Sequence, residues 1–138
     1  TARHLDRTEH VIAVDQSFAC CEKLRQRFGV GGKVSVVQSD VREYKGVSEV
    51  IVAKAFLKHF GPDEWSAILT QLLGMATRQA IIGMGIADDV CDRNPDVPYY
   101  DLAVPEDAVL GVIENAGWRV AKTLWSDALE RGFVCVPR

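Results

Sequence analysis

Short apolar runs alternate with longer amphipathic stretches along most of the chain, a pattern typical of α/β proteins. Runs rich in Val and Ile have the length of buried strands. They predict strands at Val11–Val14, Lys33–Val37, Glu49–Ala53 and Gln79–Met84. Apolar residues at helical spacing predict helices at Ser17–Phe28, 61–76 and 105–116. Two final runs, Trp118–Trp125 and Gly132–Val136, predict an antiparallel hairpin.

The order of these elements predicts an open, mostly parallel α/β sheet that ends in the antiparallel hairpin. Gly29 is placed to end the first helix, in which Phe18, Cys21, Leu24 and Phe28 recur at helical spacing. Pro62 and Pro105 are each followed by two acidic residues, the arrangement that favours a helix start. We interpret the apolar face of the second helix as the face that packs on the sheet. That face comprises Trp65, Ile68, Leu69, Leu72, Leu73 and Ala76.

Two segments depart from the regular alternation. Residues 88–104 form a polar, proline-bearing insertion that contains Tyr99 and Tyr100. A segment of this length inside a compact domain is typical of a lid or binding loop, with simple disorder as the alternative. Residues Ala2–Arg7 resemble the last turns of a helix whose start would precede residue 1.

Composition limits the class of protein. The 138 residues are 48% hydrophobic and 25% charged, which predicts one domain with a single core. The net charge of −3 and the lack of a dense Lys/Arg stripe argue against nucleic acid and membrane partners and favour a small-molecule substrate. No apolar run approaches the roughly 20 residues of a membrane span, and Thr1–His10 resembles no signal peptide, so we expect a cytoplasmic protein.

The four cysteines do not form a CxxC motif. Cys20 and Cys21 are adjacent in a predicted helix and should point to different faces. We interpret all four, including Cys91 and Cys135, as reduced, buried small residues. No group of His, Cys and carboxylates has metal-ligand spacing, and the acidic residues near the start of the insertion are consistent with a solvated loop.

Acidic residues follow two of the predicted strands. Asp15 ends the first strand and Asp40 comes just after the second, at the carboxyl ends where open α/β sheets bind ligands. A carboxylate at Asp15 can accept hydrogen bonds from both hydroxyls of a ribose. Capping of the following helix by Asp15 or Ser17 is the alternative.

The motifs together resemble the class I S-adenosylmethionine-dependent methyltransferases over nearly the whole chain. Val-Ile-Ala-Val-Asp-Gln-Ser is similar to that family's second strand, and Val-Val-Gln-Ser-Asp-Val to its third. The resemblance implies that Asp15, with Gln16, binds the cofactor's ribose, and that Asp40, with Val41, binds its adenine. The run from Val50 to Phe60 is similar to the fourth strand and following loop, and the Pro-Glu-Asp helix, the Ala-Gly-Trp turn and the final hairpin resemble the closing elements.

The resemblance lacks one part. The family's first strand and glycine-rich loop have no counterpart, so we expect an N-terminally truncated methyltransferase sheet. Three outcomes are open: the chain is a fragment, the family's second and fourth strands pair directly, or another subunit completes the sheet. Because unpaired strand edges seek partners, we expect a homodimer or another form of self-association.

Catalytic candidates follow the third predicted strand. His59 could act as a general base, with a surface or packing role as the alternative. Phe56 and Lys58 could line the acceptor site, and Tyr99 or Tyr100 could close over it. No Asn/Asp-Pro-Pro-aromatic motif follows the strand, which argues against a resemblance to exocyclic base methyltransferases.

The sequence thus favours an enzyme that moves a methyl group from S-adenosylmethionine to an oxygen, nitrogen or carbon of a small molecule. The alternative is a non-catalytic methyltransferase-like module that acts in interaction or dimerisation. A nicotinamide-binding domain would explain Asp15, but neither Asp40 nor the terminal hairpin.

Overall fold

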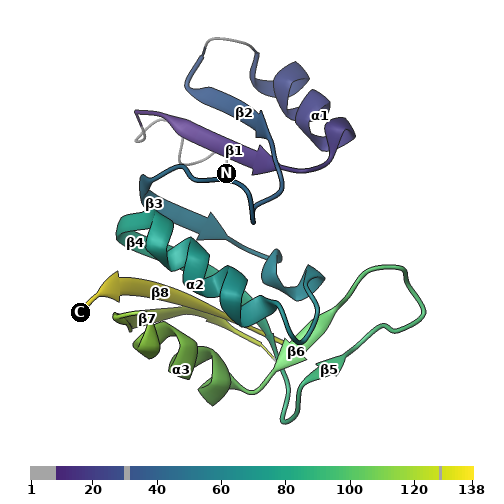
Figure 1. Ribbon diagram of the computed structural model, residues 1–138, viewed down its shortest axis with the longest axis vertical. Helices are drawn as coiled ribbons and strands as arrows, with labels where there is room; N and C mark the ends of the chain where they lie inside the picture. Colours follow the sequence, from purple (N-terminus) through teal and green to yellow (C-terminus); the bar gives the residue numbers. More distant parts are fainter. Residues whose placement is uncertain (1–8, 30–31, 128) are drawn as a thin grey trace. The chain divides into compact units, whose positions relative to one another are not determined.

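The computed structural model describes residues 9–29, 32–127 and 129–138. The chain forms two compact units, Thr1–Lys45 and Gly46–Arg138, which we call unit 1 and unit 2 (Figure 1). The helical turns expected at residues 2–7 lie outside the described residues.

Unit 1 is a strand-helix-strand motif, as the sequence predicts. It comprises β1 (Val11–Asp15), α1 (Phe18–Phe28) and β2 (Val34–Gln38). β1 and β2 pair in parallel, from Val11 opposite Val34 to Asp15 opposite Gln38. Ser17 is the N-cap of α1, and its hydroxyl accepts a hydrogen bond from the backbone N–H of Cys20 at 3.2 Å.

The helix α1 differs from the predicted pattern at its first residue. Phe18 is 64% exposed, whereas Cys21 is fully buried and donates its thiol to the carbonyl of Asp15 at 3.4 Å. A side chain in the first turn of a helix leans beyond the helix start, so the ring of Phe18 does not reach the strands. Gly29 ends the helix with a positive φ of 76°, as predicted, and its N–H donates to the carbonyl of Arg25.

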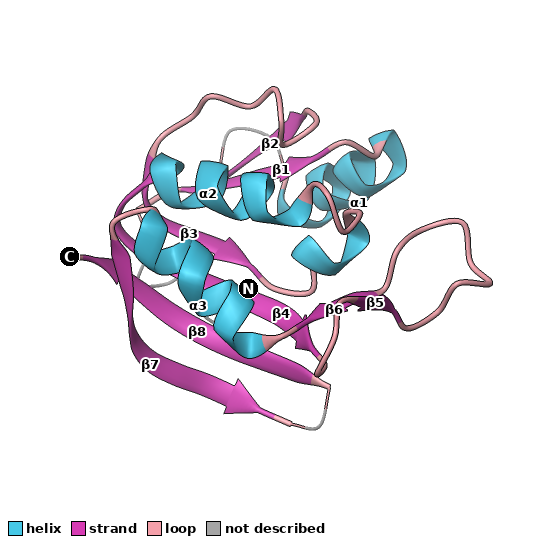
Figure 2. Cartoon of the chain, turned by 60° about the horizontal axis from the view of Figure 1, so that its bottom comes forward, coloured by secondary structure: helices cyan, strands magenta, loops and turns pink. Residues whose placement is uncertain are grey.

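Unit 2 contains the larger sheet and two α-helices. Its elements are β3 (Ser48–Ala53), the 3-10 helix η2 (Leu57–His59), α2 (Trp65–Met75), β4 (Ala76–Ile86), β5 (Cys91–Asp92), β6 (Leu102–Val104), α3 (Glu106–Asn115), β7 (Trp118–Ser126) and β8 (Glu130–Pro137). The six strands have the order β5-β6-β4-β8-β7, with β3 paired to β4. Helices α2 and α3 cover one face of this sheet (Figures 1 and 2).

The larger sheet is mixed, which corrects the expectation of a mostly parallel one. β3 and β6 run parallel to β4, but β8 enters antiparallel beside β4, and β5 and β7 are antiparallel to their neighbours. The predicted C-terminal hairpin is confirmed as β7 and β8. Among the described residues β1 belongs to the two-stranded sheet of unit 1 and β3 to the six-stranded sheet of unit 2.

The apolar face of α2 packs in the core, as predicted. Leu69 and Leu73 are fully buried, and Trp65, Ile68 and Leu72 are at most 6% exposed. Ala76, predicted to belong to this face, is also buried but is the first residue of β4. The helix begins at Trp65 and not at Pro62. The reason is a turn in which the N–H groups of Glu64 and Trp65 both donate to the carbonyl of Gly61.

The insertion is more ordered than a loop. β5 pairs antiparallel with β6, and Leu102, Ala103 and Val104 are at most 1% exposed, so its end belongs to the core. One carboxylate oxygen of Asp92 accepts from the N–H groups of Asn94 and Asp101, which closes the base of the projecting loop (Figure 2). A three-residue apolar run is too short to stand out in the sequence, which is why β6 was not predicted.

All four cysteines are free thiols, as predicted, but only two are buried. Cys20 and Cys91 are exposed, which corrects the interpretation of every cysteine as a core residue. Burial raises the pKa of Cys135 to about 11, so its thiol is inert. No helix among the described residues is long and apolar enough to cross a membrane.

Candidate functional site

The carboxyl edge of the β1–β2 pair brings the two predicted cofactor carboxylates together. Asp15 is the last residue of β1, and Asp40 lies two residues beyond the end of β2. The N–H of Ser39 donates to the backbone carbonyl of Asp15 at 3.0 Å, which joins the two strand ends. A parallel pair directs both ends to one edge, where α/β proteins bind ligands.

The side chain of Asp15 is half-buried, and one of its two carboxylate oxygens accepts a hydrogen bond. Its Oδ1 accepts a hydrogen bond from the N–H of Ser17 at 2.7 Å, which fixes the turn between β1 and α1. Its Oδ2 has no partner among the described residues. Both alternatives raised by the sequence therefore coexist, because one oxygen supports the helix start and the other can accept from a ligand hydroxyl. The neighbouring Gln16 is exposed, and its backbone carbonyl accepts from Gln38 at 3.4 Å.

Asp40 is bound by a neighbour in the sequence. Arg42 donates to both oxygens of its carboxylate, with Nη2 at 2.6 Å from Oδ2 and Nε at 3.0 Å from Oδ1. The side-chain and backbone hydrogen bonds from Arg42 lower the pKa of Asp40 to about 2. Val41, which stands between Asp40 and Arg42 in the sequence, is half-buried. A ligand amino group at Asp40 would therefore share the carboxylate with a guanidinium.

In unit 2 the predicted acceptor residues follow the carboxyl end of β3. Ala55 has a positive φ of 52°, which is unusual for a residue with a Cβ and typical of strained turns at binding sites. The turn leads into Phe56, whose ring lies edge-on to Phe60 at 5.1 Å between centroids. Lys58 and His59 are consecutive residues of η2 and so point in different directions.

His59 is held by the insertion. Its Nδ1 lies 3.2 Å from the backbone carbonyl of Tyr100, and the ring of Tyr99 lies edge-on at 5.6 Å. A carbonyl can only accept, so Nδ1 is the donor in this contact, and in the neutral form of the ring the lone pair lies on Nε2. The ring of Tyr100 packs on Gly61, where a Cβ would lie 3.2 Å from Tyr100 Cε2. The structure thus brings three of the predicted residues together, in an exposed cluster.

Lys58 belongs to a second contact between η2 and the insertion. Its Nζ lies 3.5 Å from Asp101 Oδ1, and Arg93 Nη2 lies 3.0 Å from the same oxygen. Burial alone would raise the pKa of Asp101, but the hydrogen bond and charge of Arg93, aided by Lys58, outweigh it and lower that pKa. Arg93 Nη1 also donates to the carbonyl of Leu129 at 2.8 Å, so the β7–β8 turn joins this contact.

An open surface cavity of about 520 Å³ lies at this contact. We call it the charged cavity. It is lined by Lys58, Arg93, Asp101, Asp127, Leu129 and Glu130. Of these, the sequence singled out only Lys58. The others come from segments that are distant in sequence, and no local motif marks them.

Trp125 is another residue without a sequence signal. Its indole lies over Gly83 and Gly132, on the strands β4 and β8, and a Cβ at either glycine would collide with it. The ammonium of Lys54 lies 5.3 Å from the ring centroid. The two glycines thus leave room for a large aromatic side chain on the sheet.

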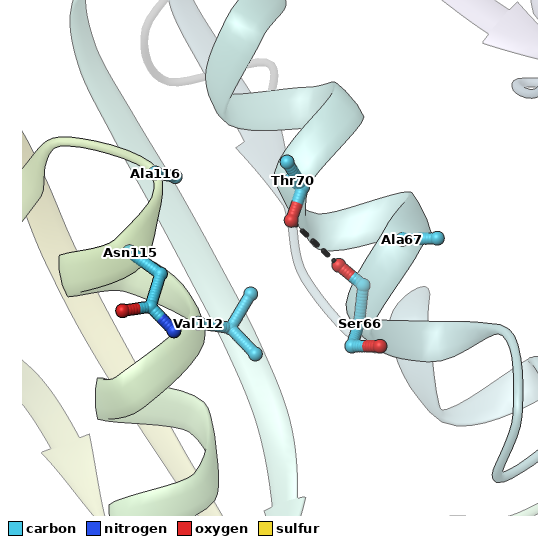
Figure 3. A pocket seen from close by; sticks show the side chains of 6 residues that line it. All are labelled: Ser66, Ala67, Thr70, Val112, Asn115 and Ala116. Atoms are coloured by element: carbon cyan, nitrogen blue, oxygen red, sulfur yellow. Dashed lines mark hydrogen bonds between the residues drawn. The ribbon is translucent and has the colours of Figure 1, made fainter.

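A shallow groove of about 300 Å³ lies between α2 and α3 (Figure 3). Its lining residues are Ser66, Ala67, Thr70, Val112, Asn115 and Ala116, none of which titrates. The hydroxyl of Thr70 donates to the carbonyl of Ser66 at 2.9 Å and is occupied within its own helix. The groove offers no group for catalysis.

Comparisons by sequence and by structure give different results. No protein-family model matches the chain, and no curated protein matches it. Solved structures do. A magnesium protoporphyrin IX methyltransferase from Synechocystis PCC 6803, with bound SAM, has a TM-score of 0.75 and 17% identity over 94% of this chain and 60% of that one.

Two further solved structures agree with this match. A Burkholderia thailandensis 1,6-didemethyltoxoflavin-N1-methyltransferase, with bound 1,6-didemethyltoxoflavin and S-adenosylhomocysteine, has a TM-score of 0.79 and 16% identity over 99% of this chain and 64% of that one. The mitomycin 7-O-methyltransferase MmcR has a TM-score of 0.68 and 14% identity over 94% and 49%. The resemblance to class I methyltransferases is confirmed at the level of the fold, and the chain spans less than two thirds of the length of these three proteins.

Proposed function

We propose that the protein takes part in S-adenosylmethionine-dependent methyl transfer to a small-molecule acceptor. The observation that carries this proposal is the partly unpaired carboxylate of Asp15 at the carboxyl end of β1, in a chain with a methyltransferase fold. Neighbours of this fold were solved with SAM or S-adenosylhomocysteine bound. Because the chain covers only part of the length of these proteins, we propose the methyl-transfer activity and do not infer it from the fold alone.

The edge of unit 1 fits the nucleoside end of the cofactor. Asp15 Oδ2 would accept from a ribose hydroxyl while Oδ1 keeps the turn in place, and the exposed side chain of Gln16 adds a second polar contact. Asp40 and Val41 would lie against the adenine, with Arg42 retaining part of the Asp40 carboxylate.

In unit 2 the proposed general base is His59. When bound, S-adenosylmethionine supplies an electrophilic methyl group on a positively charged sulfur. The lone pair of His59 Nε2 would take the proton from an acceptor hydroxyl or amine, whose electron pair then forms the bond to the methyl carbon as the carbon–sulfur bond breaks. The carbonyl of Tyr100 stabilises the resulting imidazolium through Nδ1. Phe56, Tyr99 and Tyr100 would line the acceptor site.

The proposal includes self-association. In the described residues β1 pairs only with β2, and β3 pairs only with β4, so each has one edge without a strand partner. Exposed strand edges are templates for pairing with another chain. Sedimentation velocity across a concentration series would detect a dimer, and a monomer at every concentration would contradict this part of the proposal.

The cofactor test is isothermal titration with S-adenosylmethionine and S-adenosylhomocysteine, with NADH as the unrelated nucleotide. We expect both methyltransferase ligands to bind and NADH not to bind. Asp15→Asn keeps an oxygen for the N–H of Ser17 but removes the charge, and it should weaken binding by about 1–3 kcal/mol. Glu43→Gln is the matched control, because it removes an exposed carboxylate from the same unit outside the proposed site.

Two results would contradict the proposal. Binding that Asp15→Asn and Glu43→Gln weaken equally would mean that Asp15 has no specific role. A folded protein that binds neither methyltransferase ligand would favour the non-catalytic module.

A further inference from the structure

Arg93 acts mainly as a structural cation in the charged cavity. Its Nη2 donates to Asp101 Oδ1 at 3.0 Å and its Nη1 to the carbonyl of Leu129 at 2.8 Å. The side chain is only 18% exposed, and its guanidinium lies beside Gly85, where a Cβ would be 3.0 Å from Nη2. Arg93 therefore pairs with the carboxylate of Asp101 and is fixed in place.

Lys58 is the second of the two cations that face Asp101, in a lining that also contains the carboxylates of Asp127 and Glu130. Its Nζ lies 3.5 Å from Asp101, farther than Arg93 does, and this is the one contact its ammonium makes among the described residues. An ammonium has three donors, so at least two remain for a ligand. The Lys58 side chain is 25% exposed, and a charge that is partly shielded from water interacts more strongly with an opposite charge.

The carboxylates on the other side of the cavity differ in their engagement. Asp127 Oδ1 accepts from the N–H groups of Leu129 and Glu130, both at 2.8 Å, and these bonds lower the pKa of Asp127. The carboxylate of Glu130 has no partner among the described residues. The cavity thus has a basic side at Lys58 and an acidic side at Glu130, and the two sides predict opposite ligand charges.

The basic side adjoins the proposed general base in the chain. Lys58 precedes His59 in η2, and Asp101 follows Tyr100 in the insertion. The same two segments therefore hold His59 through the Tyr100 carbonyl and Lys58 through the Asp101 carboxylate. The acidic side lies on the β7–β8 turn, which carries no candidate for the chemistry.

We propose that the charged cavity binds an anionic group of a small ligand, of the carboxylate class, through the ammonium of Lys58. The inference rests on the proposed function in one respect, namely that this ligand is the methyl acceptor. Lys58 then selects the acceptor by charge, and Arg93 and Asp101 are positioning residues that keep the cavity open beside it.

The test compares three probes that share a phenol ring and differ in charge: para-hydroxybenzoate, para-hydroxybenzamide and tyramine. Binding is measured by NMR line broadening of each probe with the full chain, without cofactor. We expect the benzoate to bind about tenfold more tightly than the amide, and tyramine more weakly still. Lys58→Met keeps an unbranched side chain one atom shorter, removes the charge and should abolish the difference between benzoate and amide. Lys54→Met is the matched control, because this nearby lysine does not line the cavity.

Equal binding of benzoate and amide, no binding of any probe, or loss of the preference in both lysine variants would overturn the proposal. Preference for tyramine that disappears in Glu130→Gln would assign the cavity to cations and overturn it as well. Titration with S-adenosylhomocysteine separates the two proposals: a Lys58-dependent preference without cofactor binding supports the anion site and contradicts methyl transfer. Cofactor binding without a charge preference does the reverse.

Discussion

The candidate residues of the two units are held in place by different kinds of contact. In unit 1 each of the two candidate carboxylates is bound by a residue two positions away, Asp15 by Ser17 and Asp40 by Arg42. In unit 2 the contacts join distant segments, with His59 meeting Tyr100 and Arg93 meeting Leu129. Local contacts survive wherever the local turn forms, whereas distant ones depend on the packed fold. The site in unit 2 should therefore be lost when the fold of unit 2 loosens, whereas the turns in unit 1 need only their own neighbouring residues.

The two units also differ in the number of buried hydrophobic residues, which is much larger in unit 2. Among the described residues of unit 1 only Cys21 and Val34 are buried hydrophobic residues, and every other member of the core lies in unit 2. Because burial of apolar surface is the main stabilising term, most of the free energy of folding resides in unit 2.

The largest expected effect comes from the core of unit 2. Leu69→Ala, in the middle of α2, removes a fully buried side chain and should lower the free energy of unfolding by about 2–5 kcal/mol. Ile12→Ala in β1 truncates a side chain that is 42% exposed and should cost less. Urea denaturation followed by circular dichroism measures both. Equal losses would contradict the assignment of the stability to unit 2.

The next effect concerns the sheet of unit 2. Gly132→Ala places a methyl group against the indole of Trp125 and should destabilise the protein by about 1–3 kcal/mol. Gly111→Ala in α3 is the control, because no atom would meet its Cβ and a helix gains stability from alanine. In thermal melts the two variants should shift in opposite directions. A Trp125→Ala background should remove the penalty at Gly132, and a penalty that remains would rule out the indole as its cause.

A smaller effect is expected where the insertion meets η2. Asp101→Asn removes the charge that Arg93 and Lys58 share and should cost about 1 kcal/mol and speed proteolysis of the insertion. Asp96→Asn, on an exposed residue of the same insertion, should change neither.

This contact also predicts a dependence on pH. Since folding lowers the pKa of Asp101 below the ordinary 3.8, its contribution is present above about pH 4 and is lost as the pH falls through the folded-state value. The stability difference between the parent protein and Asp101→Asn should therefore vanish in acid. A difference independent of pH would mean that the charge is not responsible.

The smallest effect on stability belongs to unit 1. Arg42→Gln should raise the pKa of Asp40 from about 2 toward 3.8, because the guanidinium no longer binds the carboxylate. The free energy of unfolding should hardly change, since the pair is local and exposed to solvent. An NMR titration of the Asp40 carboxyl carbon measures the pKa. An unchanged value would exclude Arg42 as the cause.

The difference between local and distant contacts also explains which elements and site residues could be predicted from the sequence. The β-branched strand cores, the amphipathic face of α2 and the glycine at the end of α1 are local patterns, so their elements were predicted, although α2 begins only at Trp65 and β4 extends beyond Gln79–Met84 at both ends. Asp15 and Asp40 were found because strand ends of a parallel pair share an edge. β6 and the pairing of β8 beside β4 were not predicted, because strand pairing depends on which distant segments meet.

The candidate residues divide in the same way. His59 and Lys58 were chosen from their place after a strand, but their partners Tyr100 and Asp101 come from the far end of the insertion. Arg93 and Glu130 have no local signature, since they line a common cavity only once the fold has brought the segment after β5 next to the β7–β8 turn.

The contact of the Trp125 indole with Gly83 and Gly132 restricts which residues can replace these three during evolution. A residue with a side chain at position 83 or 132 is compatible only with a smaller residue at position 125, so the three positions are expected to change together among related chains. Where the tryptophan is lost, the glycines are released to become β-branched residues, which suit strands better. Covariation of these three positions would therefore reveal, in an alignment alone, that β4, β8 and β7 are neighbours in this order.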